Sequence, residues 1–158
     1  MVSNSTSQST RARVEVSVPP PEDLLRSLCD VPIARLGETW SERCLGPQGK
    51  EQGVYVIHHG ERIVYVGKTD GPSMTFGVRL RREFQESASG GRHIFPKLVA
   101  LTIPPTIKVC LLPASVLRSM VTVSGTALRD VELIPICEAV FIAVYKPEFQ
   151  TDPRQAVV

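Results

Sequence analysis

Residues 53–67 read GVYVIHHGERIVYVG, and this stretch decides the fold that we predict. Two short runs of apolar, largely β-branched residues, 54–57 and 63–66, flank a polar turn that contains Gly60. Apolar runs on either side of a glycine turn are typical of a β-hairpin. We therefore expect the chain to be built around this hairpin.

A register symmetric about the turn would pair Tyr55 with Tyr65 and Gly53 with Gly67. Because side chains alternate along a strand, these four residues would share one face. The valines of the two strands would take the other face, against a core: Val54, Val56, Val64 and Val66. A ligand backbone could approach the Tyr/Gly face closely, since glycine has no side chain. The alternative is an ordinary hairpin with two amphipathic tyrosines, and a slip of one residue would turn one tyrosine to the other face.

The chain has 158 residues, which suits one domain with a core large enough to fold alone. Its hydrophobic content of 42% and charged content of 22% are usual for a soluble globular protein. Prolines interrupt the longest apolar stretches, and the first ten residues have no apolar signal core. We therefore expect a cytoplasmic protein without a membrane span.

The four cysteines are widely spaced, at Cys29, Cys44, Cys110 and Cys137, with no CxxC motif. This spacing makes a zinc site improbable and favours reduced, mostly buried thiols, although it leaves a disulfide open.

Charge is unevenly distributed, although the net charge is only +2. Residues 62–97 contain seven basic residues against three acidic ones. A local positive excess beside the hairpin suits a polyanionic partner such as nucleic acid. The alternative is a solvated helix face with spare arginines.

Other elements follow from local patterns. Residues 1–20 are polar and then proline-rich, so we expect a disordered tail, followed by a helical lead-in over 21–50 that starts at Pro21. The spacing predicts a helix over 75–87, with Thr75 as its cap. Its expected buried stripe is Phe76, Leu80 and Phe84. Its expected polar face is Arg79, Arg82, Glu83 and Glu86.

In the C-terminal part, residues 107–112 predict a buried strand, whereas 117–123 suit either a helix or a strand. Pro135 and Pro147 would delimit a last helix. Its expected buried stripe is Ile136, Val140, Phe141, Val144 and Tyr145. Glu138 is the only charge in the apolar part of this helix. It could interact with the helix dipole in a partly exposed first turn, or it could bind a hard cation.

Five features in this order resemble the GIY-YIG nuclease superfamily. They are Gly53-Val54-Tyr55, Tyr65-Val66-Gly67, Arg79, Glu138 and Pro147. The resemblance spans about residues 50–151 and looks most like the Type II restriction endonuclease branch. It implies an α/β (α+β) fold, with a small, mainly antiparallel three-stranded sheet flanked by helices, over residues 51–158.

The resemblance also implies Mg²⁺-dependent or Mn²⁺-dependent hydrolysis of DNA. By analogy Tyr55 would activate the attacking water, with help from a positive group such as Lys68. Tyr65 would hydrogen-bond the phosphate or the water, and Arg79 would bind the non-bridging oxygens. Glu138 would hold the metal ion.

Two positions depart from the family pattern. Glu83 stands where His or Tyr is usual, and it could pair with Arg79, bind metal or accept a proton; a surface ion pair is the simplest interpretation. Gln150 replaces the usual asparagine and could hold a loop or contact DNA. Further candidates for DNA backbone contacts are basic: Lys68, Arg81, Arg82, Arg92, His93 and Lys97.

We therefore expect an endonuclease that cuts double-stranded DNA and that could act as a homodimer. One alternative is a catalytically weakened DNA-binding or regulatory module on the same fold. Others are a nicking nuclease of the repair or homing type, and an unrelated small α/β protein in which the motifs are coincidental.

Overall fold

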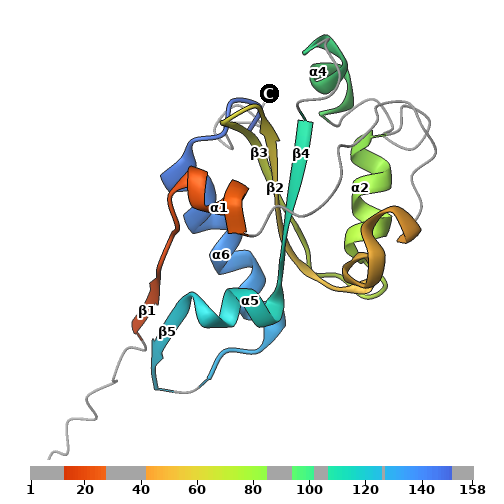
Figure 1. Ribbon diagram of the computed structural model, residues 1–158. Helices are drawn as coiled ribbons and strands as arrows, with labels where there is room; N and C mark the ends of the chain where they lie inside the picture. The colour runs from red at the N-terminus through yellow and green to blue at the C-terminus, as the bar shows by residue number, and fades with distance from the viewer. Residues whose placement is uncertain (1–12, 28–41, 85–93, 102–106, 126, 151–158) are drawn as a thin grey trace, which may run out of the picture.

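A central three-stranded antiparallel sheet organises the protein (Figure 1). The computed structural model describes residues 13–27, 42–84, 94–101, 107–125 and 127–150. The strands occur in the order β3-β2-β4: β3 (Arg62–Thr69), β2 (Gly53–His59) and β4 (Ile107–Pro113). The predicted hairpin and the predicted strand at 107–112 are thus confirmed, as is a mixed α+β architecture.

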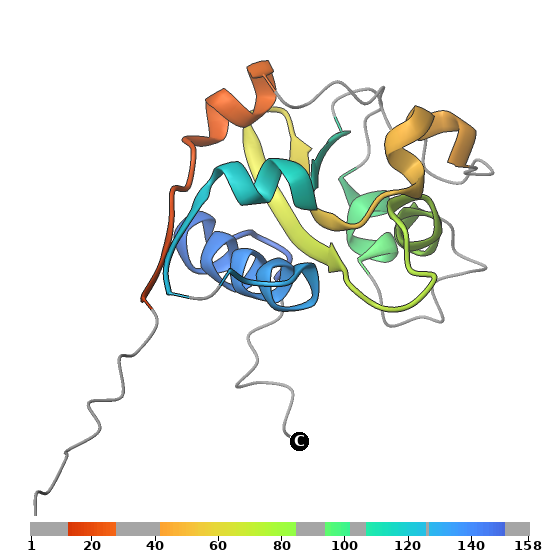
Figure 2. The same cartoon turned by 90° about the horizontal axis from the view of Figure 1, so that it is seen from below.

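Helices cover both faces of the sheet, which makes three layers (Figures 1 and 2). One layer contains α1 (Pro21–Ser27), α5 (Ala114–Ser119) and α6 (Asp130–Tyr145). The opposite layer contains the 3₁₀ helix η1 (Glu42–Lys50), α2 (Phe76–Phe84) and α4 (Phe95–Ala100).

Each face of the sheet has its own buried cluster. On the α6 side, alternate residues of β2, such as Val54 and Val56, pack with Leu133 and Phe141 of α6. On the α2 side, Tyr55 and Ile57 of β2 pack with the helix's predicted stripe, which is fully buried: Phe76, Leu80 and Phe84. The period-two pattern of β2 therefore splits the core into two halves.

A second, two-stranded sheet lies beside the α6 layer. Its strands are β1 (Arg13–Val16) and β5 (Val121–Ser124), which pair antiparallel. The prediction of a disordered tail over residues 1–20 is therefore wrong for β1. The ambiguous segment 117–123 is helical in its first part and a strand in its last part, because α5 ends at Ser119 and β5 begins at Val121.

The hairpin register differs from the symmetric one that we expected. Tyr55 lies opposite Gly67 and Ile57 opposite Tyr65, and the register shifts after Ile57. The shift is a bulge, which adds a residue to one strand. As a result Val64 packs in the cluster on the tyrosine face instead of with the other valines.

The open space expected beside the tyrosines is filled by the protein itself. A methyl group on Gly67 would overlap the phenol ring of Tyr55, and one on Gly53 would overlap the carbonyl of Leu112 on β4. Both glycines therefore allow close packing within the fold, and the expected ligand approach to this bare backbone is wrong.

We expect Gly67→Ala to destabilise the fold by about 1–3 kcal/mol, because the Tyr55 ring would be displaced from its packed position. Gly71→Ala is the matched control, since its new methyl group would meet only the side chain of Met74 at 3.7 Å. Urea denaturation of both variants checks this, and equal stability of the two would contradict it.

The last helix begins earlier than predicted. It starts at Asp130, where the carboxylate of Glu132 accepts a hydrogen bond from the Arg129 N–H at 2.9 Å. Pro135 therefore lies within the helix, beyond its first turn. The fully buried face is Leu133, Ile134, Cys137 and Phe141, so of the predicted stripe only Phe141 is confirmed as buried, and Val144 is 56% exposed.

Two other sequence predictions concern cysteines and membranes. Cys110 and Cys137 are buried thiols that form no disulfide with a described residue, as predicted, whereas the side chains of Cys29 and Cys44 lie outside the described part of the chain. Among the helices that the structure describes, none is both long and apolar enough to cross a membrane.

His58 is fully buried on β2, opposite Ile63 and Lys108. Neither ring nitrogen has a hydrogen-bond partner among the described residues. Burial, and secondarily the charge of Lys108, lowers the pKa of His58 from 6.5 to about 4. The folded protein therefore keeps this imidazole neutral where the unfolded chain would protonate it.

We expect this histidine to make the protein acid-sensitive. Above about pH 6.5, His58 does not change the free energy of unfolding with pH. Between about pH 6.5 and 4 it lowers this free energy by about 3 kcal/mol in total, and below about pH 4 it causes no further change. His58→Leu should remove this part of the pH dependence of the free energy of unfolding. An unchanged difference between pH 7 and pH 4 in the variant would show that His58 is not responsible.

Candidate functional site

Six residues predicted from sequence come together beside the β2–β3 pair. Tyr55 is on β2, Tyr65 and Lys68 are on β3, Arg79 and Glu83 are on α2, and Glu138 is on α6. The two phenol rings lie on the same side of the hairpin, with centroids 6.1 Å apart. The register shift after Ile57 does not separate them, because the shared face of the tyrosines is preserved.

The innermost part of the site is a triad of Tyr55, Glu83 and Arg79. The Tyr55 hydroxyl donates to Glu83 Oε1 at 3.0 Å and accepts from Arg79 Nε at 3.2 Å. Arg79 Nε also lies 3.1 Å from Glu83 Oε1. The three groups thus form a closed triangle of polar contacts.

Glu83 is not on a polar surface, which corrects the prediction. Its side chain is 1% exposed, whereas that of Arg79, one turn earlier, is 24% exposed. The i, i+4 ion pair is confirmed, but it is buried under the sheet and shared with Tyr55. A buried carboxylate is stable only when it is paired and hydrogen-bonded, and this triad provides both. Glu86 lies outside the described residues.

Both phenols are held in their protonated form. Burial, followed by the negative charge of Glu83, raises the pKa of Tyr55 well above 10, and the Arg79 guanidinium only partly opposes this. Burial likewise raises the pKa of Tyr65, and here too Glu83 adds and Arg79 opposes. Burial by itself would lower the pKa of Arg79, but the neighbouring Tyr55 and Glu83 raise it overall, so the guanidinium stays charged. The raised pKa does not suit Tyr55 to the role of general base.

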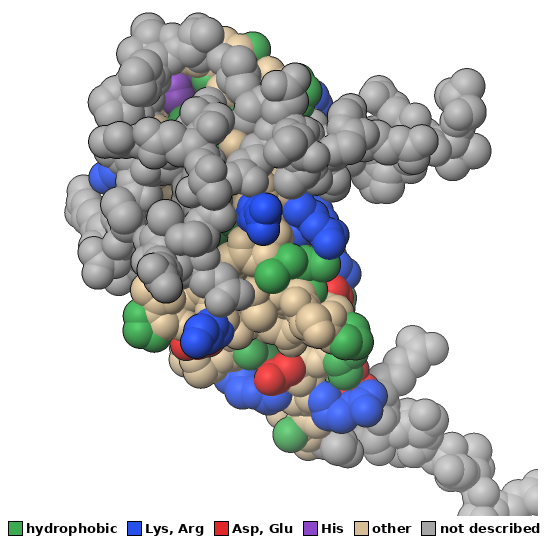
Figure 3. Space-filling model, turned by 90° about the vertical axis from the view of Figure 1, so that its right-hand side faces the viewer, with side chains coloured by type: hydrophobic (Ala, Val, Ile, Leu, Met, Phe, Trp, Pro, Cys, Tyr) green, Lys and Arg blue, Asp and Glu red, His purple; other side chains and the backbone are tan. Residues whose placement is uncertain are grey.

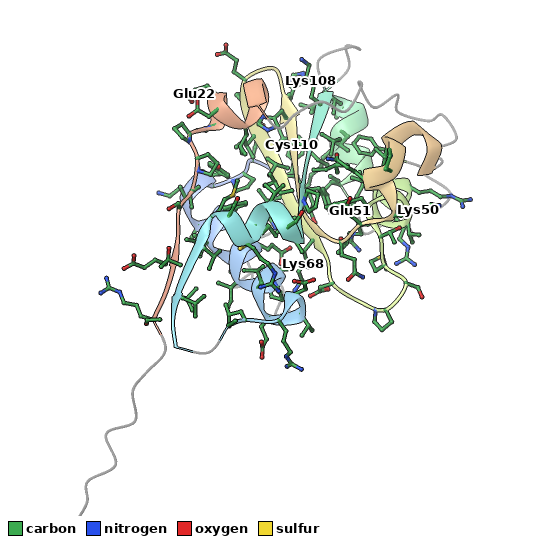
Figure 4. The ribbon with its side chains drawn as sticks, turned by 60° about the horizontal axis from the view of Figure 1, so that its bottom comes forward. Glu22, Lys50, Glu51, Lys68, Lys108 and Cys110 are labelled. Atoms are coloured by element: carbon green, nitrogen blue, oxygen red, sulfur yellow. The ribbon has the colours of Figure 1, made fainter. Side chains whose placement is uncertain are left out.

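A second, more accessible group of charges surrounds Lys68. Its ammonium Nζ lies 3.1 Å from Asp70 Oδ2 and 3.6 Å from Glu138 Oε2. Figure 4 shows Lys68 beside α6, far from Lys108, which belongs to the other end of the sheet. Asp70 was not predicted from the sequence, although its spacing of two from Lys68 along the chain could have indicated that the two side chains project together.

Glu138 is not in the first turn of its helix. It lies two turns inside α6, which begins at Asp130, so an interaction with the helix N-terminus does not explain it. Its side chain is 20% exposed. Burial raises the pKa of Glu138, and the Lys68 ammonium partly lowers it again.

Electrostatic interactions also link the two charge groups, although burial is the largest cause of each pKa shift. Glu138 raises the pKa of Tyr65, and Arg79 lowers the pKa of Glu138. Tyr55 and Glu83 lie at the buried end of this site. The partly exposed end is formed by Tyr65, Lys68, Asp70, Arg79 and Glu138.

The accessible end has the donors that a hard divalent cation prefers. Asp70 and Glu138 both direct a carboxylate oxygen at the positive Lys68 ammonium, which a metal ion bound to these oxygens would displace. The described residues contain no group of three or more His, Cys, Asp or Glu side chains suited to a metal. Mg²⁺ commonly uses only one or two protein carboxylates and completes its shell with water and phosphate oxygens, so the donor set fits this ion.

Of the residues proposed to contact a nucleic acid backbone, those that the structure describes are accessible. Arg81, Arg82 and Lys97 are exposed on α2 and α4, and Lys97 Nζ lies 5.8 Å from the centroid of the Phe149 ring. Figure 3 shows blue Lys and Arg side chains spread over the described part of the α2 side, with red ones among them. Arg92 and His93 lie outside the described residues.

Gln150 has a structural role at the outer edge of the sheet. Its Oε1 accepts a hydrogen bond from the Val66 N–H at 3.3 Å, and the neighbouring Phe149 N–H donates to the Val64 carbonyl at 2.8 Å. The segment after α6 thus satisfies exposed backbone groups of β3. This agrees with the first of its two predicted roles, holding a loop.

Comparisons of the chain with protein-family models, with curated proteins and with solved structures found no match. The chemistry of the site is therefore argued from its own residues.

We expect Lys68→Met to raise the pKa of Glu138 further, because the variant loses the positive charge that opposes the effect of burial. Lys50→Met is the control, since Lys50 projects from η1 away from Lys68 (Figure 4). An NMR titration of the glutamate carboxyl groups measures this. A fall in the Glu138 pKa would contradict the contact with Lys68.

Proposed function

We propose that this protein is a divalent-metal-dependent endonuclease of the GIY-YIG type that hydrolyses phosphodiester bonds of double-stranded DNA. The observation that carries the proposal is the convergence of Tyr55, Tyr65, Arg79 and Glu138 from four separate elements. These residues were selected from the sequence for their order and type alone. A chance occurrence of the motifs would not require them to meet at one site.

Arg79 and Lys68 supply the phosphate-binding groups in this proposal. Both are cationic and partly exposed. The planar guanidinium of Arg79 matches the geometry of two phosphate oxygens, and the ammonium of Lys68 acts as a mobile point charge. Tyr65 keeps its proton because of its raised pKa, so it can donate a hydrogen bond to a phosphate oxygen or to water.

The charge balance of the site explains why a divalent cation would be needed. Two cations, Lys68 and Arg79, face three carboxylates, Asp70, Glu83 and Glu138, which gives a formal charge of −1. A negative site repels a phosphate diester. One Mg²⁺ or Mn²⁺ held by Glu138 would reverse the sign to +1 and, when bound, would stabilise the charge that develops on the leaving oxygen.

A homodimer would allow both strands of a symmetric DNA site to be cut, and exposed Arg81, Arg82 and Lys97 would contact the backbone.

One observation favours a second candidate, a DNA-binding module without cleavage. Glu83 stands where the resembled family has His or Tyr, and it already accepts a hydrogen bond from the Tyr55 hydroxyl.

Cleavage of supercoiled plasmid separates the two candidates. We expect Mg²⁺ to support cleavage, EDTA to abolish it, and Glu138→Gln to reduce it by at least about 100-fold, because the site loses its metal ligand. Glu148→Gln is the matched control, an exposed glutamate paired with Arg62 outside the site.

Full activity of Glu138→Gln would refute the metal site. Folded wild-type protein that binds DNA but cuts none in Mg²⁺ or Mn²⁺ would favour the binding module.

A further inference from the structure

We propose that Tyr55 and Glu83 form a buried anchor that positions Arg79, and that Tyr55 is a positioning residue and not the group that takes a proton from water. This inference rests on the proposed function, in which Arg79 binds the scissile phosphate. It assigns to Tyr55 a different role from the one that the family resemblance implies.

The hydroxyl of Tyr55 is already committed within the protein. It donates its one hydrogen bond to Glu83 and accepts a hydrogen bond from Arg79. The whole residue is 0% exposed. Attack on a phosphate requires the base to reach a water in line with the leaving oxygen, and this phenol has no surface on which such a water could sit.

The ring of Tyr55 is also fixed in place. It lies across the backbone of Gly67 so closely that no β-carbon fits between them. Phe76, Leu80 and Ile57 belong to the same buried cluster. The ring therefore cannot turn outward without disrupting the core. As a result, the Tyr55 hydroxyl cannot reach the partly exposed end of the site.

The anchor holds Arg79 by one nitrogen of its guanidinium. The short contacts to the Tyr55 hydroxyl and to Glu83 Oε1 are both made by Nε, and Tyr65 also hydrogen-bonds Arg79. The two terminal nitrogens are the fork that suits a phosphate. A guanidinium held at Nε loses less conformational freedom when a phosphate binds, so its position is prepared before DNA arrives.

The anchor also explains why a glutamate at position 83, where the resembled family has His or Tyr, is compatible with the proposed function. On α2 it follows Arg79 by one turn, so helix geometry aligns the two side chains. A histidine or tyrosine at this position could not provide a negative charge to the guanidinium. The chain thus replaces a donor with a carboxylate that orients Arg79.

Two conservative variants test the two residues of the anchor separately. Tyr55→Phe keeps the ring over Gly67 but removes the hydroxyl, and Glu83→Gln keeps the shape but removes the charge. In both folded variants we expect the Arg79 Nε–H signal in ¹⁵N NMR to shift and its hydrogen exchange to accelerate by about tenfold or more. Duplex DNA affinity measured with Ca²⁺ should fall by about tenfold.

Cleavage kinetics supply the readout that a purely structural role would not move. We expect Tyr55→Phe to retain measurable cleavage with an unchanged shape of the pH–rate profile, because no titrating base has been lost. Adding Glu83→Gln to Arg79→Gln should change DNA affinity no further, because the two residues act through the same contact. Arg62→Gln, which replaces an exposed arginine paired with Glu148 outside the site, is the control for general loss of charge.

The outcomes separate the anchor from the proposed function. Loss of cleavage in Tyr55→Phe with unchanged Arg79 Nε–H exchange and unchanged DNA affinity would overturn the anchor and restore Tyr55 as the base. Unchanged exchange in Glu83→Gln would also overturn it, even if Tyr55→Phe did not fold. Wild-type DNA affinity and cleavage in Arg79→Gln would refute the proposed function itself.

Discussion

The ring of Tyr55 lies across Gly67 on the neighbouring strand, and much of the molecule depends on this contact. It closes the space above the β2–β3 pair, so α2 can pack directly on the ring with its row of Phe76, Leu80 and Phe84. The same packing places Arg79 and Glu83 at the tyrosine hydroxyl, because they directly precede Leu80 and Phe84 on that helix. A glycine without a side chain is therefore a requirement of the site as well as of the sheet.

Placing a carboxylate inside an apolar cluster is costly unless its hydrogen bonds and its charge are both satisfied. The charge of Glu83 is paired with the Arg79 guanidinium, and its Oε1 accepts a hydrogen bond from the Tyr55 hydroxyl. Replacing such a buried pair with apolar residues would often stabilise a protein, so its retention points to specificity of geometry more than to stability. Here the geometry that it specifies is the position of the Arg79 guanidinium at the boundary between core and solvent.

The accessible end of the site works by a different physical principle. Lys68 lies between Asp70 and Glu138, where solvent screens each contact and the ion pairs contribute little to folding. What these groups determine is the sign of the local field. Three carboxylates against two cations give the site a formal charge of −1, which the proposed divalent ion at Glu138 would reverse.

The amino-acid sequence was sufficient to predict the hairpin, the strand at 107–112, the buried stripe of α2 and the residue types of the site. These follow from local rules: alternation in strands, helical spacing and a glycine at a turn. It did not determine the register, since the bulge after Ile57 depends on how Val64 and Ile63 divide between two cores. It missed the start of α6, because a proline typical of a first turn lies inside a helix whose true beginning is capped by Glu132.

The burial of Glu83 and the inclusion of Asp70 in the site depend on how distant segments pack. The i, i+4 spacing predicted that Glu83 would meet Arg79, but whether that pair faced water or the sheet depended on which side of α2 packed against Tyr55. Asp70 acquired its role because α6 brings Glu138 to the end of β3. Local sequence fixes which groups a segment carries, whereas the packing of distant segments fixes their exposure, and exposure determines the chemistry that each group can perform.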